Sequence, residues 1–245
     1  ASTNFAWYEN NGTNLSFTRH LIDSTAASTT SMFDVQPIDF DEDGDIDVVM
    51  AAHGLGITLG VYSWYENDGT DTSFTFHEID SNLGEPSNIY VIDFDEDGDL
   101  DVLGAAQNDG EFAWYQNDGS DTSFTKRSID ATAAATGAAY IEAIDFDEDG
   151  DIDVVAAADE GQEFMWYQND GTDLSFTRRS IDTSSNASSA WRARPLDFDK
   201  DGDLDVVTVA KNSSSPFAWY ENDGEADPSW TAADIATNAD GAYGI

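Results

Sequence analysis

Asp39-Phe-Asp-Glu-Asp-Gly-Asp-Ile-Asp47 is one of four near-identical acidic nonapeptides in this chain of 245 residues. The other three begin at Asp93, Asp145 and Asp197, so the motif returns after 54, 52 and 52 residues. A period of this length, with turn signals and no long helical pattern, is typical of folds built from repeated β-sheet units. The motif therefore bears on the fold through its spacing and on function through its carboxylates.

The alternating carboxylates of the motif suit a calcium ion. Ca²⁺ takes six to eight oxygen ligands, and a glycine at position 6 permits the sharp bend that folds the loop around the ion. Aspartates at positions 1, 3 and 5 would supply side-chain oxygens, position 7 its main-chain carbonyl, and position 9 a closing carboxylate. The predicted metal ligands are Asp39, Asp41, Asp43, Asp45 and Asp47; Asp93, Asp95, Asp97, Asp99 and Asp101; Asp145, Asp147, Asp149, Asp151 and Asp153; and Asp197, Asp199, Asp201, Asp203 and Asp205.

We therefore expect one structural Ca²⁺ per loop. The alternative is an acidic, solvated turn without an ion, but five carboxylates within nine residues repel one another strongly in the absence of a cation. Mg²⁺ fits less well because it retains its waters. The loop is not an EF-hand, since that motif needs a bidentate Glu at position 12, where this chain has Met50, Gly104, Ala156 and Thr208.

A second repeated element, Trp-Tyr-[Glu/Gln]-Asn-[Asn/Asp]-Gly, begins at Trp7, Trp64, Trp114, Trp166 and Trp219. Around the first acidic loop, one period predicts four strands, over 33–40, 47–52, 61–67 and 73–79, from β-branched runs, alternation and the Asn-Asp-Gly turn signal. We therefore predict an all-β fold, a β-propeller of about five four-stranded blades. The repeated aromatics are interpreted as packing between blades, with sugar platforms as the alternative.

With these residues the chain resembles the FG-GAP or VCBS repeat family, the integrin-type calcium-binding β-propeller. The resemblance covers nearly the whole chain, and it identifies Asp-x-Asp-x-Asp-Gly-x-x-Asp between strands one and two as that family's calcium site. The family includes integrin α-subunit heads, bacterial surface proteins and some fungal lectins. The chain departs from it in two ways: the name-giving dipeptides leave only a trace at Gly104-Ala-Ala106, and the family usually has seven blades.

We predict one domain over 1–245. The expected blade repeats are 24–80, 81–130, 131–182 and 183–235, with a fifth, incomplete blade made from 1–23 and 236–245. Terminal strands joined in this way would close the ring and remove exposed edges. The alternative is part of a larger propeller, whose unpaired edges could join neighbouring chains and so allow self-assembly.

Composition limits the environment and the partners. The formal net charge of −41 disfavours nucleic acid and anionic membranes, and the sequence has no transmembrane run for direct membrane insertion. Without cysteine, no disulfide staples the fold, so calcium would take that role. Because cytosolic calcium is too dilute to fill ordinary weak sites, we expect a secreted or cell-surface protein.

Positions that change from repeat to repeat are candidates for ligand contact. Counting back from the first loop aspartate, positions −1 and −4 are apolar and predicted to be core, while −5 and −3 change chemistry in every blade. The predicted ligand-binding residues are Asp34, Gln36, Asn88, Tyr90, Tyr140, Glu142, Trp191, Arg192 and Arg194. The two arginines beside a tryptophan suit an acidic or sulfated sugar; alternatively they neutralise neighbouring acids.

These features favour an extracellular, calcium-stabilised binding or adhesion module, lectin-like, that recognises a glycan or protein partner on the face opposite the calcium loops. The alternative is a structural subunit of a surface assembly or filament. A polysaccharide-active enzyme, or its accessory domain, is less favoured because the three histidines are scattered and no nucleophile or zinc motif is present. For that case Glu142 and Asp34 are the carboxylates expected to face the channel.

Overall fold

The computed structural model describes residues 5–13, 15–23, 29–54, 59–212, 217–225 and 228–236. Within these ranges the chain is all-β apart from two short 3-10 turns, η2 (Ala133–Ala135) and η3 (Ser185–Ala187). The strands are β1 (Phe5–Asn10) and β2 (Phe17–Asp23); β3 (Thr29–Ile38), β4 (Asp47–Gly54), β5 (Gly60–Asn67) and β6 (Phe74–Leu83); β7 (Pro86–Ile92), β8 (Asp101–Ala106), β9 (Glu111–Asn117) and β10 (Phe124–Asp130); β11 (Ala138–Ile144), β12 (Asp153–Ala158), β13 (Glu163–Asn169) and β14 (Phe176–Asp182); and β15 (Ala190–Leu196), β16 (Asp205–Ala210), β17 (Phe217–Asn222) and β18 (Trp230–Ala236).

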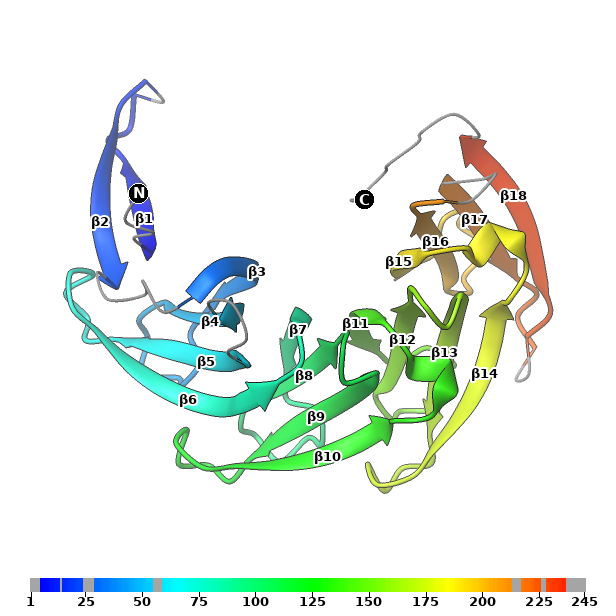
Figure 1. Cartoon of the computed structure of the whole chain (residues 1–245), viewed down its shortest axis with the longest axis horizontal. Coiled ribbons are helices and arrows are strands. Elements are labelled where there is room, and N and C mark those ends of the chain that lie inside the picture. The colour runs from blue at the N-terminus through cyan, green and yellow to red at the C-terminus, as the bar shows by residue number, and fades with distance from the viewer. Residues whose placement is uncertain are drawn as a thin grey trace.

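Four of the sheets have four antiparallel strands in chain order, and β1 and β2 form a fifth sheet of two strands. Figure 1 shows the sheets as successive blades of an arc, with β3, β7, β11 and β15 on the inner side and β6, β10, β14 and β18 outermost. The predicted strands agree with this order; for example, 61–67 corresponds to β5. The arrangement confirms the all-β, propeller-like class.

The expected ring closure is not formed by the described residues. The β1–β2 sheet and the β15–β18 sheet lie at opposite ends of an open arc (Figure 1). The closing strand was expected in 236–245, of which 237–245 lie outside the described residues. β1 also occupies the place of a third strand, whose neighbour in the other blades is a second strand. A first strand alone would therefore not lie next to β1, and a second strand would be needed between them.

The second strand of each blade forms its centre. β8, β12 and β16 are buried along their whole length, and the runs of Val, Ala and Leu in β8 and β12 lie between neighbouring sheets on both sides. At each of four junctions a tyrosine hydroxyl donates to an aspartate at the end of the previous outer strand. These bonds are Tyr65–Asp23 (2.9 Å), Tyr115–Asp80 (3.1 Å), Tyr167–Asp130 (2.7 Å) and Tyr220–Asp182 (2.5 Å).

The repeated aromatics pack between blades, as expected. Phe40 lies 5.0 Å from the ring of Trp64 in its own blade and 6.1 Å from Phe124 in the next. The Trp64 indole also donates to the carbonyl of Asp121, 2.9 Å away in the next blade. The same trio recurs at the two following junctions as Phe94, Trp114 and Phe176, and as Phe146, Trp166 and Trp230.

Candidate functional site

Each acidic loop connects the first and second strands of a four-stranded blade. In every loop three carboxylates offer oxygens that all lie within 4.8 Å of one another. The groups are Asp39, Asp41 and Asp43; Asp93, Asp95 and Asp101; Asp145, Asp147 and Asp153; and Asp197, Asp199 and Asp201. The structure thus brings together positions 1 and 3 in all four loops, with position 5 or 9 as the third member.

The backbone of the loops explains why position 6 is always glycine. Its φ is 101° at Gly44, Gly98 and Gly150, and 109° at Gly202. These angles lie in a region that side-chain-bearing residues rarely adopt, so glycine lets the chain fold back at low cost. The carboxylates at positions 1, 3 and 5 then accept main-chain N–H groups within the loop, such as Gly44 N to Asp39 Oδ2 (3.1 Å).

Position 9 holds the loop to the rest of the blade. The Asp101 side chain is fully buried, and its two oxygens accept the N–H groups of Phe94 (3.0 Å) and Asn117 (2.7 Å). Equivalent pairs of bonds are made by Asp47, Asp153 and Asp205. This residue therefore ties the loop to the end of the third strand as well as facing the carboxylate group.

Position 7 points elsewhere. A Cβ placed on Gly69 would lie 2.6 Å from Asp45 Oδ2, and the same close approach recurs between Asp99 and Gly119. The side chain therefore lies against the turn after the third strand. This orientation is compatible with the expectation that position 7 offers its main-chain carbonyl, which stays a prediction.

The first three loops fit a bound cation, whereas the grouped carboxylates of the fourth are exposed. Asp39, Asp93, Asp95 and Asp147 each have a buried Oδ1 with no hydrogen-bond partner in the described part of the chain. Burial, together with the neighbouring Asp47 charge, raises the pKa of Asp41 to about 6. Burial likewise raises the pKa of Asp101 and Asp153 to about 7. Buried, unpaired carboxylate oxygens are costly unless a cation or proton meets them, and oxygen-only donors are those that Ca²⁺ prefers.

Residues outside the nonapeptide also contact the loops. Gln116 Nε2 donates to Asp95 Oδ2 (2.5 Å), and its Oε1 accepts from Arg127 Nε (2.9 Å). Gln168 joins Asp147 to Arg179 in the same way. In the first complete blade Glu66 replaces the glutamine. Sequence reasoning missed these contacts, although the Glu/Gln alternation inside the Trp-Tyr motif was a visible signal.

On the side away from the loops, the variable positions contact one another between neighbouring blades. Asn88 Nδ2 donates to Asp34 Oδ2 (2.5 Å), which also accepts the N–H of Ile89 (3.2 Å). Gln36 Oε1 accepts the N–H of Val91 (3.2 Å). Asp34, Gln36 and Asn88 thus link first strands, a structural role that the sequence did not suggest.

The other predicted ligand residues meet around Glu142. Its Oε2 accepts the Tyr140 hydroxyl (2.5 Å) and lies 3.5 Å from Arg194 Nε. Arg192 lies over the Tyr140 ring, 5.3 Å from its centroid. Burial and the Glu142 charge raise the pKa of Tyr90.

One basic group on this side was not fully anticipated. Lys211 Nζ lies 3.0 Å from the ring centroid of Trp191 and 3.4 Å from Asp159 Oδ2. We call Trp191, Arg192, Arg194 and Lys211 the basic cluster. The Arg194 side chain is 51% exposed although it contacts Glu142. The neutralising contacts expected as the alternative are therefore present, and they leave about half of the Arg194 side chain open to solvent.

Two residues predicted to be core are exposed. At position −4, Ile89, Ile141 and Ala193 are buried, but Val35 is 48% exposed. At position −1, Leu196 is exposed. Both exceptions lie in the first and last complete blades of the open arc, where no described strand covers the corresponding face.

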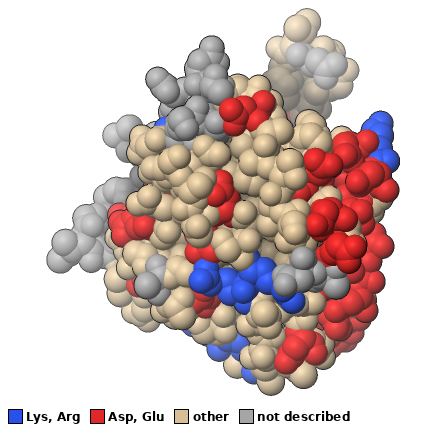
Figure 2. Space-filling view, turned by 90° about the vertical axis from the view of Figure 1, so that its right-hand side faces the viewer, with Lys and Arg blue, Asp and Glu red and all other residues tan. Residues whose placement is uncertain are grey.

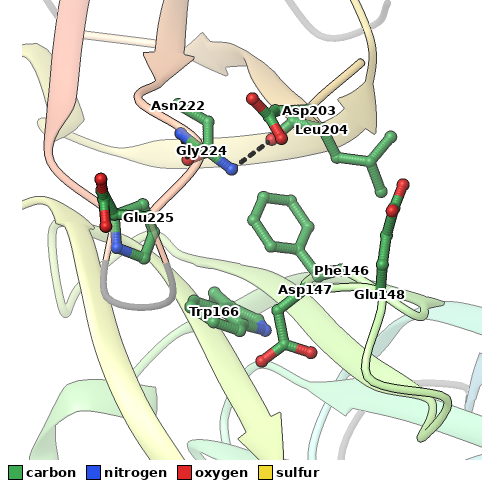
Figure 3. A pocket seen from close by; sticks show the side chains of 10 residues that line it. Phe146, Asp147, Glu148, Trp166, Asp203, Leu204, Asn222, Gly224 and Glu225 are labelled. Carbon is green, nitrogen blue, oxygen red and sulfur yellow. Dashed lines mark hydrogen bonds between the residues drawn. The ribbon is translucent and has the colours of Figure 1, made fainter.

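A pocket of about 230 Å³ opens beside the third loop, between the last two blades. Figure 3 shows Asp147 and Trp166 on one side of it and Asp203 and Glu225 on the other. Asn222 Nδ2 donates to the Leu204 carbonyl at its edge (3.0 Å). The hollow is bordered by carboxylates from both blades, and none of the ligand-contact predictions falls in it.

The outer strands carry further basic residues. Figure 2 shows a band of Lys and Arg near the middle of the face drawn and smaller basic patches at its edges, with Asp and Glu crowding its right-hand margin. On β10, Lys126 Nζ lies 2.7 Å from Glu111, and on β14 Arg178 pairs with Glu163. Because neighbouring carboxylates neutralise these cations, the outer strands are a less favourable site for an anionic ligand.

Successive four-stranded antiparallel sheets, each with an acidic loop between its first two strands, define the class of propeller-type repeat proteins. The family model described as FG-GAP-like repeat matches residues 39–104, 93–156 and 145–208, and the chain belongs to this family. A comparison with curated proteins found no match. The described residues contain no helix that is both long and apolar enough to span a membrane.

Three solved structures share this fold at low sequence identity. A lectin from Agrocybe aegerita that recognises non-reducing terminal N-acetylglucosamine has a TM-score of 0.63 at 16% identity, over 96% of this chain and 61% of the lectin chain. The exo-β-1,3-galactanase from Phanerochaete chrysosporium gives 0.54 at 13%, over 98% and 59%. The NanB sialidase of Streptococcus pneumoniae gives 0.54 at 11%, over 85% and 32%. The chain thus spans less than two thirds of each, and the likeness shows the fold alone.

Proposed function

We propose that this chain is a calcium-stabilised, extracellular propeller module that binds a glycan on the face opposite its acidic loops. The similar folds include a glycan-binding lectin and two glycan-active enzymes, which supports a carbohydrate-related module. The family, the four carboxylate groups and the unpaired buried oxygens in three of these groups support calcium. Weak oxygen-only sites fill at the millimolar calcium found outside cells, which supports the extracellular assignment.

Calcium has a structural role in this proposal. The carboxylates at positions 1, 3, 5 and 9 would hold the ion, and the buried aspartate at position 9 would also carry its effect to the third strand through its main-chain hydrogen bonds. Because the loops lie at the far end of the first strands from Trp191 and Arg192, the ions would stiffen the blade without touching the ligand. Their removal should lower stability before it alters the binding face.

The basic cluster is the main observation that supports a glycan site at this position. Arg192 and Arg194 project from β15 beside Trp191, in a chain whose net charge is −41. A guanidinium can bind carboxylate or sulfate through two parallel hydrogen bonds, and an indole offers a flat apolar surface to a sugar ring. We therefore expect an acidic or sulfated glycan, with an extracellular protein carrying equivalent acidic groups as the other partner class.

A glycan array in millimolar calcium at moderate salt tests this assignment. Acidic or sulfated glycans should bind. Arg194→Ala should lower their affinity by about ten- to a hundredfold, which corresponds to the loss of one charged hydrogen-bonding group. Arg178→Ala is the matched control, since it removes the same charge from the outer strand β14. A blank array, or equal losses in both variants, would contradict the proposed site.

A further inference from the structure

The β1–β2 sheet contacts its neighbour as a true half blade. Tyr65 of the next sheet donates its hydroxyl to Asp23 (2.9 Å), as Tyr115 does to Asp80 one junction later. The Trp7 indole donates to the carbonyl of Asp71 (3.1 Å). Trp64 makes the corresponding bond to the following blade. β1 and β2 therefore hold the places of strands three and four.

Among the described residues, one member of the aromatic trio has no counterpart at this junction. Elsewhere the loop phenylalanine, such as Phe40, packs against the tryptophan of its own blade and the first aromatic residue of the next outer strand. Trp7 and Phe74 occupy the latter two positions here. Beside them lies a cavity of about 260 Å³, lined by Trp7, Pro37, Ile46, Val48, Asp71 and Phe74.

The cavity lining matches, position by position, the residues around Phe40 at the next junction. The counterparts are Trp64, Val91, Leu100, Val102, Asp121 and Phe124. All of these except Asp121 pack with Phe40 in a single apolar cluster. The internal repeat therefore shows which side chain fits this space, a phenylalanine from an acidic loop.

Apolar residues next to the cavity are exposed where their counterparts are covered. Val35 is 48% exposed and Ile46 56%, whereas Ile89 is 3% exposed and Leu100 is half-buried. Within the described residues β1 pairs only with β2, so its other edge has no strand partner there. An open strand edge beside an exposed apolar face suits β-strand addition.

We infer that this edge accepts strands one and two of a further FG-GAP repeat, whose loop phenylalanine enters the cavity. These two added strands would complete a four-stranded sheet with β1 and β2. It would cover Val35 and Ile46 as the preceding blade covers Ile89 and Leu100. The partner is thus a strand–loop–strand segment containing Asp-Phe-Asp-x-Asp-Gly.

The test adds this segment to the chain in trans. A synthetic peptide with the sequence of 138–158, which forms β11, its loop and β12, is titrated in millimolar calcium, followed by calorimetry and by amide hydrogen exchange. Binding at one peptide per chain, with slower exchange of the β1 amides, is expected. A peptide with Phe146→Ala should bind about ten- to a hundredfold more weakly.

Two variants of the chain locate the site. Trp7→Ala should weaken peptide binding to a similar degree. Trp219→Ala changes the equivalent tryptophan at the other end of the arc and should leave binding unchanged. Equal effects of the two substitutions would overturn the inference, because they would show that the peptide does not recognise the β1 end.

A free peptide loses entropy on ordering, so a covalent version accompanies it. A copy of 132–163 is joined directly before Phe5, the counterpart of Phe164, so that the copied turn leads into β1 as it leads into β13 in the third complete blade. The inference is supported if the β1 amides become protected from hydrogen exchange and this protection disappears when the copied phenylalanine is changed to alanine. Unprotected β1 amides in both formats overturn it. A dimer of the unmodified chain that Trp7→Ala dissociates would assign the face to a second copy and also overturn it.

Discussion

Replacing the aspartate at position 9 should destabilise the protein even when calcium is removed. Asp101 is fully buried and accepts two main-chain hydrogen bonds, from Phe94 and Asn117. Asp101→Ala leaves both N–H groups without this acceptor. At about 1–3 kcal/mol for each buried N–H group left without a partner, the unfolding free energy should fall by about 2–6 kcal/mol.

The matched control is Asp97→Ala, at position 5 of the same loop. Asp97 is exposed, and its carboxylate accepts only the N–H of Asp99 (3.1 Å) among the described contacts. In chelator its loss should change the unfolding free energy by less than about 1 kcal/mol, whereas in calcium it should cost the binding energy of that site.

Urea unfolding of both variants, in chelator and in millimolar calcium, measures the two effects. The slope of free energy against urea must stay constant for the comparison to hold, because a changed slope would signal loss of two-state behaviour in a repeat protein. If Asp97→Ala and Asp101→Ala lose the same free energy in chelator, position 9 does not clamp the loop as described.

Three further predictions concern the ions and the blade junctions. Chelation should lower the Tm, since at free calcium a hundredfold above Kd each site contributes about 2.7 kcal/mol; an unchanged Tm would remove the calcium assignment. Burial raises the pKa of Asp101 and Asp153 to about 7, above an unfolded value of about 3.9. The calcium-free fold therefore holds protons that the unfolded chain releases, so its Tm should fall as pH rises from about 5 to 8, and less so in Asp153→Asn. Phe94→Ala should cost about 3–5 kcal/mol, and Phe198→Ala, at the same position but 45% exposed, about half of that or less; equal losses in urea unfolding would contradict the junction packing.

Much of the fold could be predicted from the sequence because each repeat contains its own local signals. Valine runs, the Asn-Asp-Gly turns and the fourfold acidic loop define strands and their order, and they also indicate the carboxylate groups. Val35 could not be assigned correctly in this way. Its local sequence resembles that of Ile89, and only the absence of a covering strand among the described residues makes one exposed and the other buried.

The candidate ligand face was predicted less completely. Variation between repeats did identify Glu142 and Arg194, which the structure brings into contact. It also selected Asp34 and Asn88, which link neighbouring first strands, because variation alone does not separate a ligand contact from an interblade contact. Lys211 was missed as a partner of Trp191, since twenty positions of sequence separate two side chains that meet only when adjacent strands pair.

The junction bonds have a consequence for how such a protein changes over evolutionary time. The first three complete repeats each carry a tyrosine that donates to the previous blade and an aspartate that accepts from the next, as Tyr115 and Asp130 do, whereas the last repeat has Ala236 at the position of the aspartate. A tandem duplication of one repeat would therefore insert a unit whose donors and acceptors are already matched on both sides. Blade number can change by gene duplication without any new interface having to arise, while the first-strand residues remain free to diverge.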